Sequence, residues 1–293
     1  MPPIVFSHGN GFPASTYRVL LEALRECGFA VHSIEKFGHD AAYPVTDNWP
    51  HLVRQLADFT KPIAAAAPRG KVFLVGHSLG GFLSLMCAAR HPELASGVVL
   101  LDSPLIGGWR AAGLGLVKRT PLMKSVSPGA VSQRRRNIWQ HRQAVFEHFH
   151  AKKAFAGWDP RALHDYIDHG TFDAVDLAKS AADHVVGNEV DAAAIPRTLS
   201  FDREVETAIY NTLPHNFSAL LKRHPLKCPV AFIGGRQSSE LKRAGFAMTK
   251  RVTQGRIAMI DGTHLFPMEK PEETAVLVAS ALDTLSDSDG AKR

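Results

Sequence analysis

The sequence predicts an α/β fold, in which a mostly parallel central sheet is flanked by helices and carries a helical insertion. Three observations support this fold class: short apolar runs alternate with helical patterns, a serine stands between two glycines where one run meets a helix, and one long interval breaks the alternation. A chain of 293 residues with 45% hydrophobic side chains can bury one large core. One α/β core with an insertion is therefore the expected architecture.

Six short apolar or β-branched runs are expected to be strands, and they lie at residues 4–7, 29–33, 72–75, 98–101, 230–233 and 257–260. Helical periodicity separates most of them, at residues 15–27, 49–66, 78–90, 240–251 and 272–285. Such alternation predicts parallel strands with right-handed crossovers and helices on both faces of the sheet. An open sheet of this kind binds its ligand at the carboxyl ends of the strands.

Residues 102–229 interrupt the alternation. They contain several helical stretches but no convincing pair of strands, and they are far longer than an ordinary connection. We therefore predict that residues 1–103 and 226–293 form the α/β core and that residues 104–225 form a helical cap over the site. An apolar stripe with near-helical spacing is expected to pack the cap onto the core, and it consists of Ile138, Trp139, Val145, Phe146 and Phe149.

The motif Gly76-His77-Ser78-Leu79-Gly80 follows the apolar run 72–75 and precedes a helical pattern. A strand that turns sharply into a helix forces the residue at the apex into a strained conformation, and small residues on either side let the backbone pass closely. A chance glycine-rich turn is the alternative, but the strand before it and the helix after it favour a nucleophile elbow. Ser78 is thus the candidate nucleophile, with the partial positive charge of a helix N-terminus beside it.

A serine hydroxyl is a weak nucleophile unless a base removes its proton, and the base in such sites is an imidazole that a carboxylate orients. His264 is the candidate base among 15 histidines, because it directly follows the last predicted strand.

The order of a His-Gly loop, the elbow, a helical insertion and a late histidine resembles the α/β-hydrolase superfamily over essentially the whole chain. Residues 8–13 look like the oxyanion loop of that superfamily, and residues 261–271 look like its catalytic-histidine loop. The resemblance implies an oxyanion hole formed by the backbone N–H groups of Asn10 and Leu79, with Phe12 as an alternative donor. Phe12 and His77 are assigned to substrate binding. The first run resembles the third strand of the family's sheet, so the usual N-terminal hairpin strands are expected to be missing.

The acid of the triad is left open between two carboxylates. Many members of the superfamily carry an aspartate after the strand that ends here at Gly234, but residues 234–240 contain none. Asp102 is favoured, because its strand is expected to lie beside the nucleophile strand, about 5 Å away. Glu240 is the competitor, and Asp261 or an incomplete triad is a further possibility; the simpler interpretation of Asp102 is a turn-forming aspartate before Ser-Pro.

These residues predict a serine hydrolase that cleaves an ester, thioester or related acyl compound through an acyl-enzyme on Ser78. A serine at the elbow excludes epoxide hydrolases and haloalkane dehalogenases, which need a carboxylate there. Carbon–carbon bond hydrolases, acyltransferases and cofactor-free haloperoxidases use the same triad and stay as alternatives, as does a ligand-binding protein on a hydrolase scaffold. The predicted cap indicates a small acyl substrate with an apolar portion.

Composition limits the partners, the cofactors and the cellular location that we expect. The net charge is +6, but the basic residues concentrate between Arg110 and Lys153 without a recognition motif, so no nucleic-acid partner is expected. Cys27, Cys87 and Cys228 are odd in number and lack metal-ligand spacing, so we expect no disulfide and no metal; no cofactor is expected. Neither a leader segment nor a transmembrane stretch is recognisable, which predicts a cytoplasmic protein.

Overall fold

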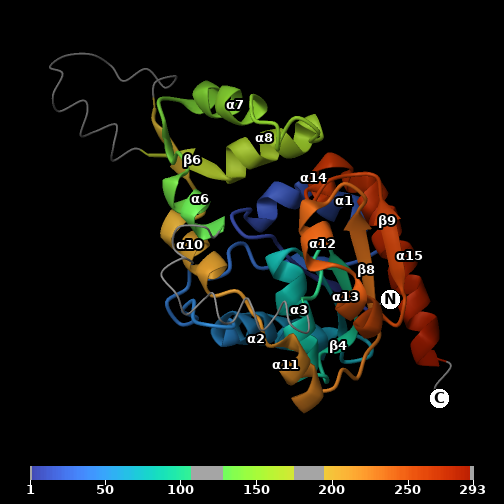
Figure 1. Ribbon diagram of the computed structural model, residues 1–293. Helices are drawn as coiled ribbons and strands as arrows, with labels where there is room; N and C mark the ends of the chain where they lie inside the picture. Colours follow the sequence, from blue (N-terminus) through green and yellow to red (C-terminus); the bar gives the residue numbers. More distant parts are fainter. Residues whose placement is uncertain (1, 107–127, 175–194, 291–293) are drawn as a thin grey trace, which may run out of the picture.

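The central sheet is six-stranded, entirely parallel and ordered β2-β1-β3-β4-β8-β9 in a computed structural model, which describes residues 2–106, 128–174 and 195–290 (Figure 1). Its strands are β1 (Ile4–Ser7), β2 (Val31–Ser33), β3 (Val72–His77), β4 (Ala95–Leu101), β8 (Val230–Gly235) and β9 (Ile257–Ile260). The predicted α/β fold with a parallel sheet is confirmed. Every residue of β1, β3 and β8 is buried, which explains why these strands appear in the sequence as unbroken apolar runs.

Helices cover both faces of the sheet. Ile4 and Phe6 belong to one apolar cluster with residues of α1 (Arg18–Glu26) and α15 (Pro271–Gly290). Val5 belongs to the other cluster, with residues of α2 (Pro50–Ala66) and α3 (Leu79–Arg90). Successive strand residues thus point to opposite faces, and each face needs its own helical layer.

The register of the two central strands sets the position of the site. Gly76 pairs with Leu100 and His77 pairs with Leu101. Ser78 and Asp102, the next residue of each strand's chain, therefore leave the sheet side by side at its carboxyl end.

One predicted helix differs from the structure. Residues 240–251 form two short helices, α12 (Ser239–Ala244) and α13 (Ala247–Thr253). Gly245 ends α12 with a φ of +76°, a conformation that glycine adopts without strain. The continuous periodicity of the sequence concealed this break.

The described part of the 104–225 segment is mostly helical, and its helices are α6 (Pro128–Arg134), α7 (Arg142–His150), α8 (Pro160–His169), α10 (Arg203–Asn211) and α11 (Phe217–Arg223). The expectation that it holds no strand pair was wrong. An antiparallel sheet of order β5-β7-β6 joins Ile138–Trp139, Arg197–Leu199 and Thr171–Asp173. Strands of two or three residues are too short to give a readable alternation.

Helices α7 and α8 lie side by side at one end of the molecule (Figure 1). Helix α8 packs on the 3-10 turn η1 (Ala14–Tyr17) and on α14 (Phe266–Glu269). Of the predicted apolar stripe, Trp139, Val145 and Phe149 are buried in the cluster that also contains α1 and α15, while Ile138 is 47% exposed. The boundaries at 103/104 and 225/226 stay predictions, and residues 107–127 and 175–194 lie outside the described residues.

No helix within residues 2–106, 128–174 and 195–290 combines the length and the apolar character needed to cross a membrane.

Candidate active site

Ser78 stands at the turn between β3 and α3. Its backbone has φ 53° and ψ −115°, a conformation that costs energy for a residue with a side chain. Glycines make the turn possible: a Cβ at Gly76 would lie 2.2 Å from the backbone of Gly80, and a Cβ at Gly80 would lie 1.9 Å from the Ser7 carbonyl oxygen. The start of α3 therefore packs directly against the end of β1.

His264 and Asp102 complete a chain of contacts from the serine. His264 lies on the loop between β9 and α14, with Nε2 at 3.1 Å from Ser78 Oγ and Nδ1 at 2.6 Å from Asp102 Oδ2. Asp102 follows β4, is fully buried and has a φ of 42°. The three side chains are thus in the order that serine hydrolysis requires: hydroxyl, imidazole, carboxylate.

The loop after β8 holds the Asp102 carboxylate. Oδ1 accepts a hydrogen bond of 2.9 Å from the backbone N–H of Gly235, and Oδ2 accepts one of 2.5 Å from Ser238 Oγ. Ser238 also caps α12 by accepting from the N–H of Leu241. The sequence analysis missed Gly235 and Ser238; the available signal was a loop that lacks its usual aspartate but carries glycines and hydroxyls.

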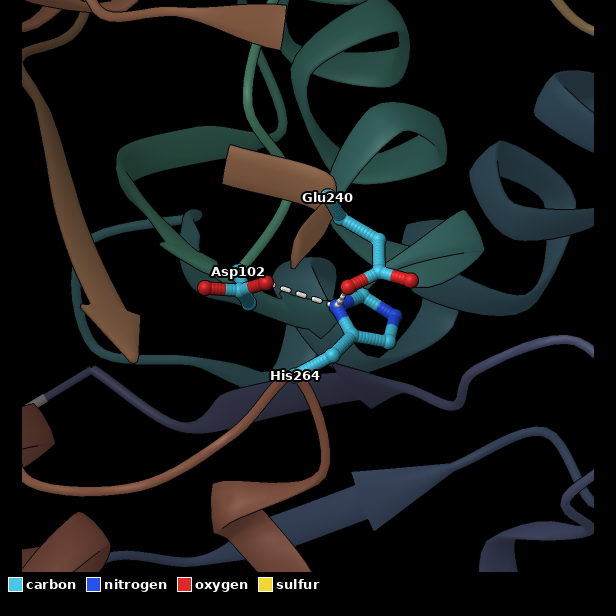
Figure 2. A group of neighbouring side chains, drawn as sticks. All are labelled: Asp102, Glu240 and His264. Carbon is cyan, nitrogen blue, oxygen red and sulfur yellow. Dashed lines mark hydrogen bonds and ion pairs between the residues drawn. The ribbon is translucent and has the colours of Figure 1, made fainter. Parts of the chain in front are cut away.

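Glu240 is the second carboxylate near the imidazole. It lies in the first turn of α12, and Figure 2 shows that it and Asp102 both point toward Nδ1 of His264. Its Oε2 is 4.0 Å from Nδ1, against 2.6 Å for Asp102, and its side chain is 41% exposed. Asp261 instead accepts a hydrogen bond from Gln237. Distance and burial favour Asp102 as the partner of His264.

The pKa of His264 reflects these neighbours. Burial lowers the pKa, but the hydrogen bond and charge of Asp102, with further contributions from Glu240 and Glu269, raise it above the ordinary value. The pKa of Glu240 is lowered, because the charge of His264 and hydrogen bonds to the carboxylate outweigh the effect of its burial.

The two backbone N–H groups predicted as oxyanion donors lie at the start of α3 and in the loop after β1. Within the described residues, the N–H groups of Leu79 and Asn10 donate to no other group of the protein. The N–H of Phe12, the alternative donor, is used in a turn and donates to the Gly9 carbonyl at 3.2 Å. His8 braces this loop, since its Nδ1 donates to the Gly9 carbonyl and its Nε2 accepts from the N–H of Phe37.

The side chain of Asn10 connects the same loop to α10. Its Nδ2 donates to the backbone carbonyl of Glu206 at 3.0 Å. The Glu206 carboxylate is buried and accepts a 2.8 Å hydrogen bond from Arg135, which also donates to the Tyr166 hydroxyl at 2.7 Å. The 104–225 segment therefore contacts the loop that carries the Asn10 N–H.

His77, which is assigned to substrate binding, lines a cavity beside Ser78, but both of its ring nitrogens already contact other groups of the protein. The ring is fully buried, its Nδ1 lies 2.7 Å from the Tyr17 hydroxyl, and its Nε2 lies 2.9 Å from the backbone carbonyl of His264. Sequence reasoning missed Tyr17 altogether. Burial lowers the pKa of His77 to about 3, so the ring is neutral.

A cavity of about 880 Å³ opens above Ser78. Its lining is mixed and includes Phe12, Lys153, Tyr210, Glu240, His264 and Leu265. Phe12, which is assigned to substrate binding, thus lines the same cavity as Ser78.

The ligand atoms of Asp102, Glu240 and His264 lie within 4.8 Å of one another. Two ligands of a tetrahedral zinc ion stand about 3.3 Å apart, because each bond is roughly 2.0–2.2 Å long. The 2.6 Å between Asp102 and His264 is a hydrogen-bond distance and leaves no room for an ion between them. This group does not fit a metal.

The fold and this geometry define an α/β hydrolase, and comparison with known proteins agrees. The chain belongs to the alpha/beta hydrolase family, whose model matches residues 4–277. It is 29% identical over 130 residues to a monoglyceride lipase homolog of Monkeypox virus, a match that covers 43% of this chain and 46% of that protein. It is 33% identical over 106 residues to the monoglyceride lipase of Rattus norvegicus, or 35% of each protein. The chain thus spans less than half the length of these curated relatives.

Among solved structures, E-2-(acetamidomethylene)succinate hydrolase superposes with a TM-score of 0.67 at 19% identity, covering 96% of this chain and 91% of that one. Such a match shows a shared fold.

Proposed function

We propose that this protein is a serine hydrolase that cleaves a carboxylic ester or a related acyl compound through an acyl-enzyme on Ser78. The observation that carries the proposal is the hydrogen-bonded chain from Ser78 Oγ through His264 to the buried Asp102, beside a cavity that Ser78 and His264 line. Relatives named as monoglyceride lipases support an ester as substrate.

The chemistry follows from the positions of these atoms. His264 Nε2 takes the proton from Ser78 Oγ as the oxygen attacks the acyl carbon, and Asp102 stabilises the imidazolium through Nδ1. The negative charge that develops on the carbonyl oxygen is stabilised by the N–H groups of Leu79 and Asn10. His264 then gives the proton to the leaving alcohol, the acyl–oxygen bond breaks, and water repeats the sequence to release the acid.

The cavity lining supports a substrate with an apolar part beside Phe12 and Leu265 and a polar part elsewhere. Thioesters are cleaved by the same steps. Carbon–carbon bond hydrolysis, acyl transfer and cofactor-free haloperoxidation use the same three residues. Activity assays with a substrate of each reaction distinguish them from ester hydrolysis.

A fluorophosphonate probe tests the nucleophile. We expect the wild-type protein to be labelled and the Ser78→Ala variant to be unlabelled, with ester turnover reduced on the order of 10⁶-fold. Ser84→Ala is the matched control, because Ser84 lies on the same helix, is fully buried and has an unpartnered hydroxyl. This variant should be labelled like the wild type.

A panel of esters, thioesters and amides of increasing acyl length, compared by kcat/KM, identifies the substrate class. A wild-type protein that neither reacts with the probe nor hydrolyses any acyl compound would contradict the proposal and favour a ligand-binding protein on a hydrolase scaffold.

A further inference from the structure

Two buried side chains that take no part in the proposed chemistry connect the oxyanion loop with the loop of His264. Tyr17, in η1, has its hydroxyl 2.9 Å from the backbone nitrogen of Gly9 and 2.7 Å from Nδ1 of His77. Nε2 of His77 is 2.9 Å from the backbone carbonyl of His264. Tyr17 is 2% exposed and His77 is fully buried, so water does not compete for these contacts.

The donors and acceptors allow one arrangement of protons. A carbonyl oxygen only accepts, so Nε2 of His77 must carry a proton and donate it to His264. The neutral ring then has a lone pair on Nδ1, which accepts from the Tyr17 O–H. The N–H of Gly9 only donates, and the Tyr17 oxygen accepts from it. Every polar group in the series is satisfied by this arrangement.

The hydrogen-bonded series of Gly9, Tyr17, His77 and His264 connects two loops that lie outside the helices and strands. Gly9 lies between β1 and η1, and His264 lies in the turn between β9 and α14. His77, in contrast, is the last residue of the buried strand β3 and directly precedes Ser78. The contacts therefore tie both loops to the strand that carries the candidate nucleophile.

Gly9 gives independent support. A Cβ at this position would lie 2.9 Å from Nδ1 of His77 and 2.9 Å from the Tyr17 hydroxyl. Only glycine lets the loop close on the two side chains. The backbone of Asn10, the next residue, is positioned by the same contact.

We infer that Tyr17 and His77 are positioning residues that hold the Asn10 N–H and the His264 imidazole in register with Ser78. The inference rests on the proposed function, because the oxyanion donor and the base must both reach the serine at the same moment. A displacement of about 1 Å in such a group costs roughly 100-fold in rate. Tyr17 and His77 act through the backbone of Gly9 and His264, which their polar atoms contact.

Removal of the Tyr17 hydroxyl tests the inference. In Tyr17→Phe we expect kcat to fall roughly 10-fold to 100-fold, with KM within about twofold, because the substrate surface is unchanged. Tyr43→Phe is the matched control: its hydroxyl contacts Asp58 on α2 at 3.1 Å, and Tyr43 does not line the cavity. That variant should keep the wild-type kcat. A Tyr17→Phe enzyme with wild-type kcat would overturn the inference.

Variants of His77 separate positioning from packing. Glutamine can present an N–H near the place of Nε2, whereas leucine cannot donate. We expect His77→Gln to retain a substantially higher kcat than His77→Leu. If His77→Leu does not fold, Tyr17→Phe still decides the question, and equal kcat values for the two His77 variants would count against the inference.

Nitrogen-15 spectra of the histidines test the same contacts without turnover. The wild-type spectrum should show His77 as the Nε2–H tautomer, and Tyr17→Phe should shift the signals of both His77 and His264. An Nδ1–H tautomer for His77 would refute the series of contacts. If the wild type proves inactive toward every acyl compound, the proposed function fails, while these spectra still judge the contacts on their own.

Discussion

Asp102 is a fully buried carboxylate whose oxygens accept from a backbone N–H, a serine hydroxyl and an imidazole, and no lysine or arginine of the described residues pairs with it. Burying a charge is costly unless hydrogen bonds replace the lost water. Here Gly235 and Ser238 supply two of them. These hydrogen bonds offset part of the cost of burying the carboxylate that orients His264 in the proposed mechanism.

Exchange of the two carboxylates identifies the acid. In Asp102→Asn, turnover of an ester substrate should fall on the order of 10⁴-fold, because an amide does not hold His264 in the required tautomer. Glu240→Gln should cost roughly fivefold, since a charge 4.0 Å away and facing water contributes about 1 kcal/mol. Steady-state kcat values give the comparison; near-normal turnover in Asp102→Asn with a large loss in Glu240→Gln would make Glu240 the acid.

The pH profile of kcat/KM provides a second measurement at this scale. His264 must be neutral to accept the serine proton, and its pKa is raised above 6.5 by Asp102 despite its burial. The value of kcat/KM should therefore rise with pH, and the midpoint of this limb should lie above pH 6.5. In Asp102→Asn the residual activity should show this limb at lower pH, because the charge that raises the pKa is gone. An unmoved limb would mean that Asp102 does not interact with the imidazole in solution.

At the scale of elements, α6 and α10 meet next to the oxyanion loop. Arg135 follows α6 and pairs with Glu206 of α10, and the two side chains are only 17% and 6% exposed. Asn10 bonds the carbonyl of the same glutamate. The ion pair thus fixes α10 at the position where it contacts the loop after β1.

Loss of one partner of this pair should be strongly destabilising. Arg135→Met leaves the buried Glu206 carboxylate unpaired, and we expect the free energy of unfolding to fall by about 3–5 kcal/mol. The matched control is Arg142→Met: Arg142 pairs with Asp168, but both side chains are nearly half exposed, so this change should cost at most about 1 kcal/mol. Urea denaturation of the two variants gives both values. Equal losses of unfolding free energy in the two variants would mean that burial does not increase the contribution of the Arg135–Glu206 pair to stability.

For the molecule as a whole, buried neutral histidines link stability to pH. Burial lowers the pKa of His8 to about 4 and that of His77 to about 3. An unfolded histidine takes up its proton near pH 6.5. Below that pH the unfolded chain binds protons that the folded protein refuses, so acid favours unfolding. His264 acts in the opposite sense, because its raised pKa gives stability that is lost as the pH rises through that pKa.

We therefore expect the free energy of unfolding to fall by about 1.4 kcal/mol per pH unit for each of His8 and His77 between pH 6.5 and pH 5. Urea denaturation at several pH values in this window measures the slope. In His77→Gln the slope should decrease by about 1.4 kcal/mol per pH unit, the contribution of one histidine. It should stay unchanged in His32→Gln, where the replaced histidine is exposed. A His77→Gln protein with the wild-type slope would contradict the lowered pKa of His77 in the folded protein.

Local patterns predicted much of the fold because their causes are local. β1, β3 and β8 are buried on both faces and appear in the sequence as apolar runs, and Gly76 is required by the close approach of Gly80 within the turn itself. The strands β5, β6 and β7 were not predictable, because two or three residues carry no measurable period. Gly245 splits α12 from α13 through a backbone conformation that a hydrophobic pattern does not report.

The sequence by itself determined the parallel sheet and the position of Ser78 at the end of β3, since burial on both faces and a tight turn constrain residue types directly. Only the tertiary structure distinguished the distances of Asp102 and Glu240 from His264, and only it brought Tyr17, His77 and the His264 backbone together. Asp102 lies 162 residues from His264 along the chain, and His77 lies 187 residues from it. Contacts over such separations depend on how strands and loops are arranged in space, and no local pattern encodes them.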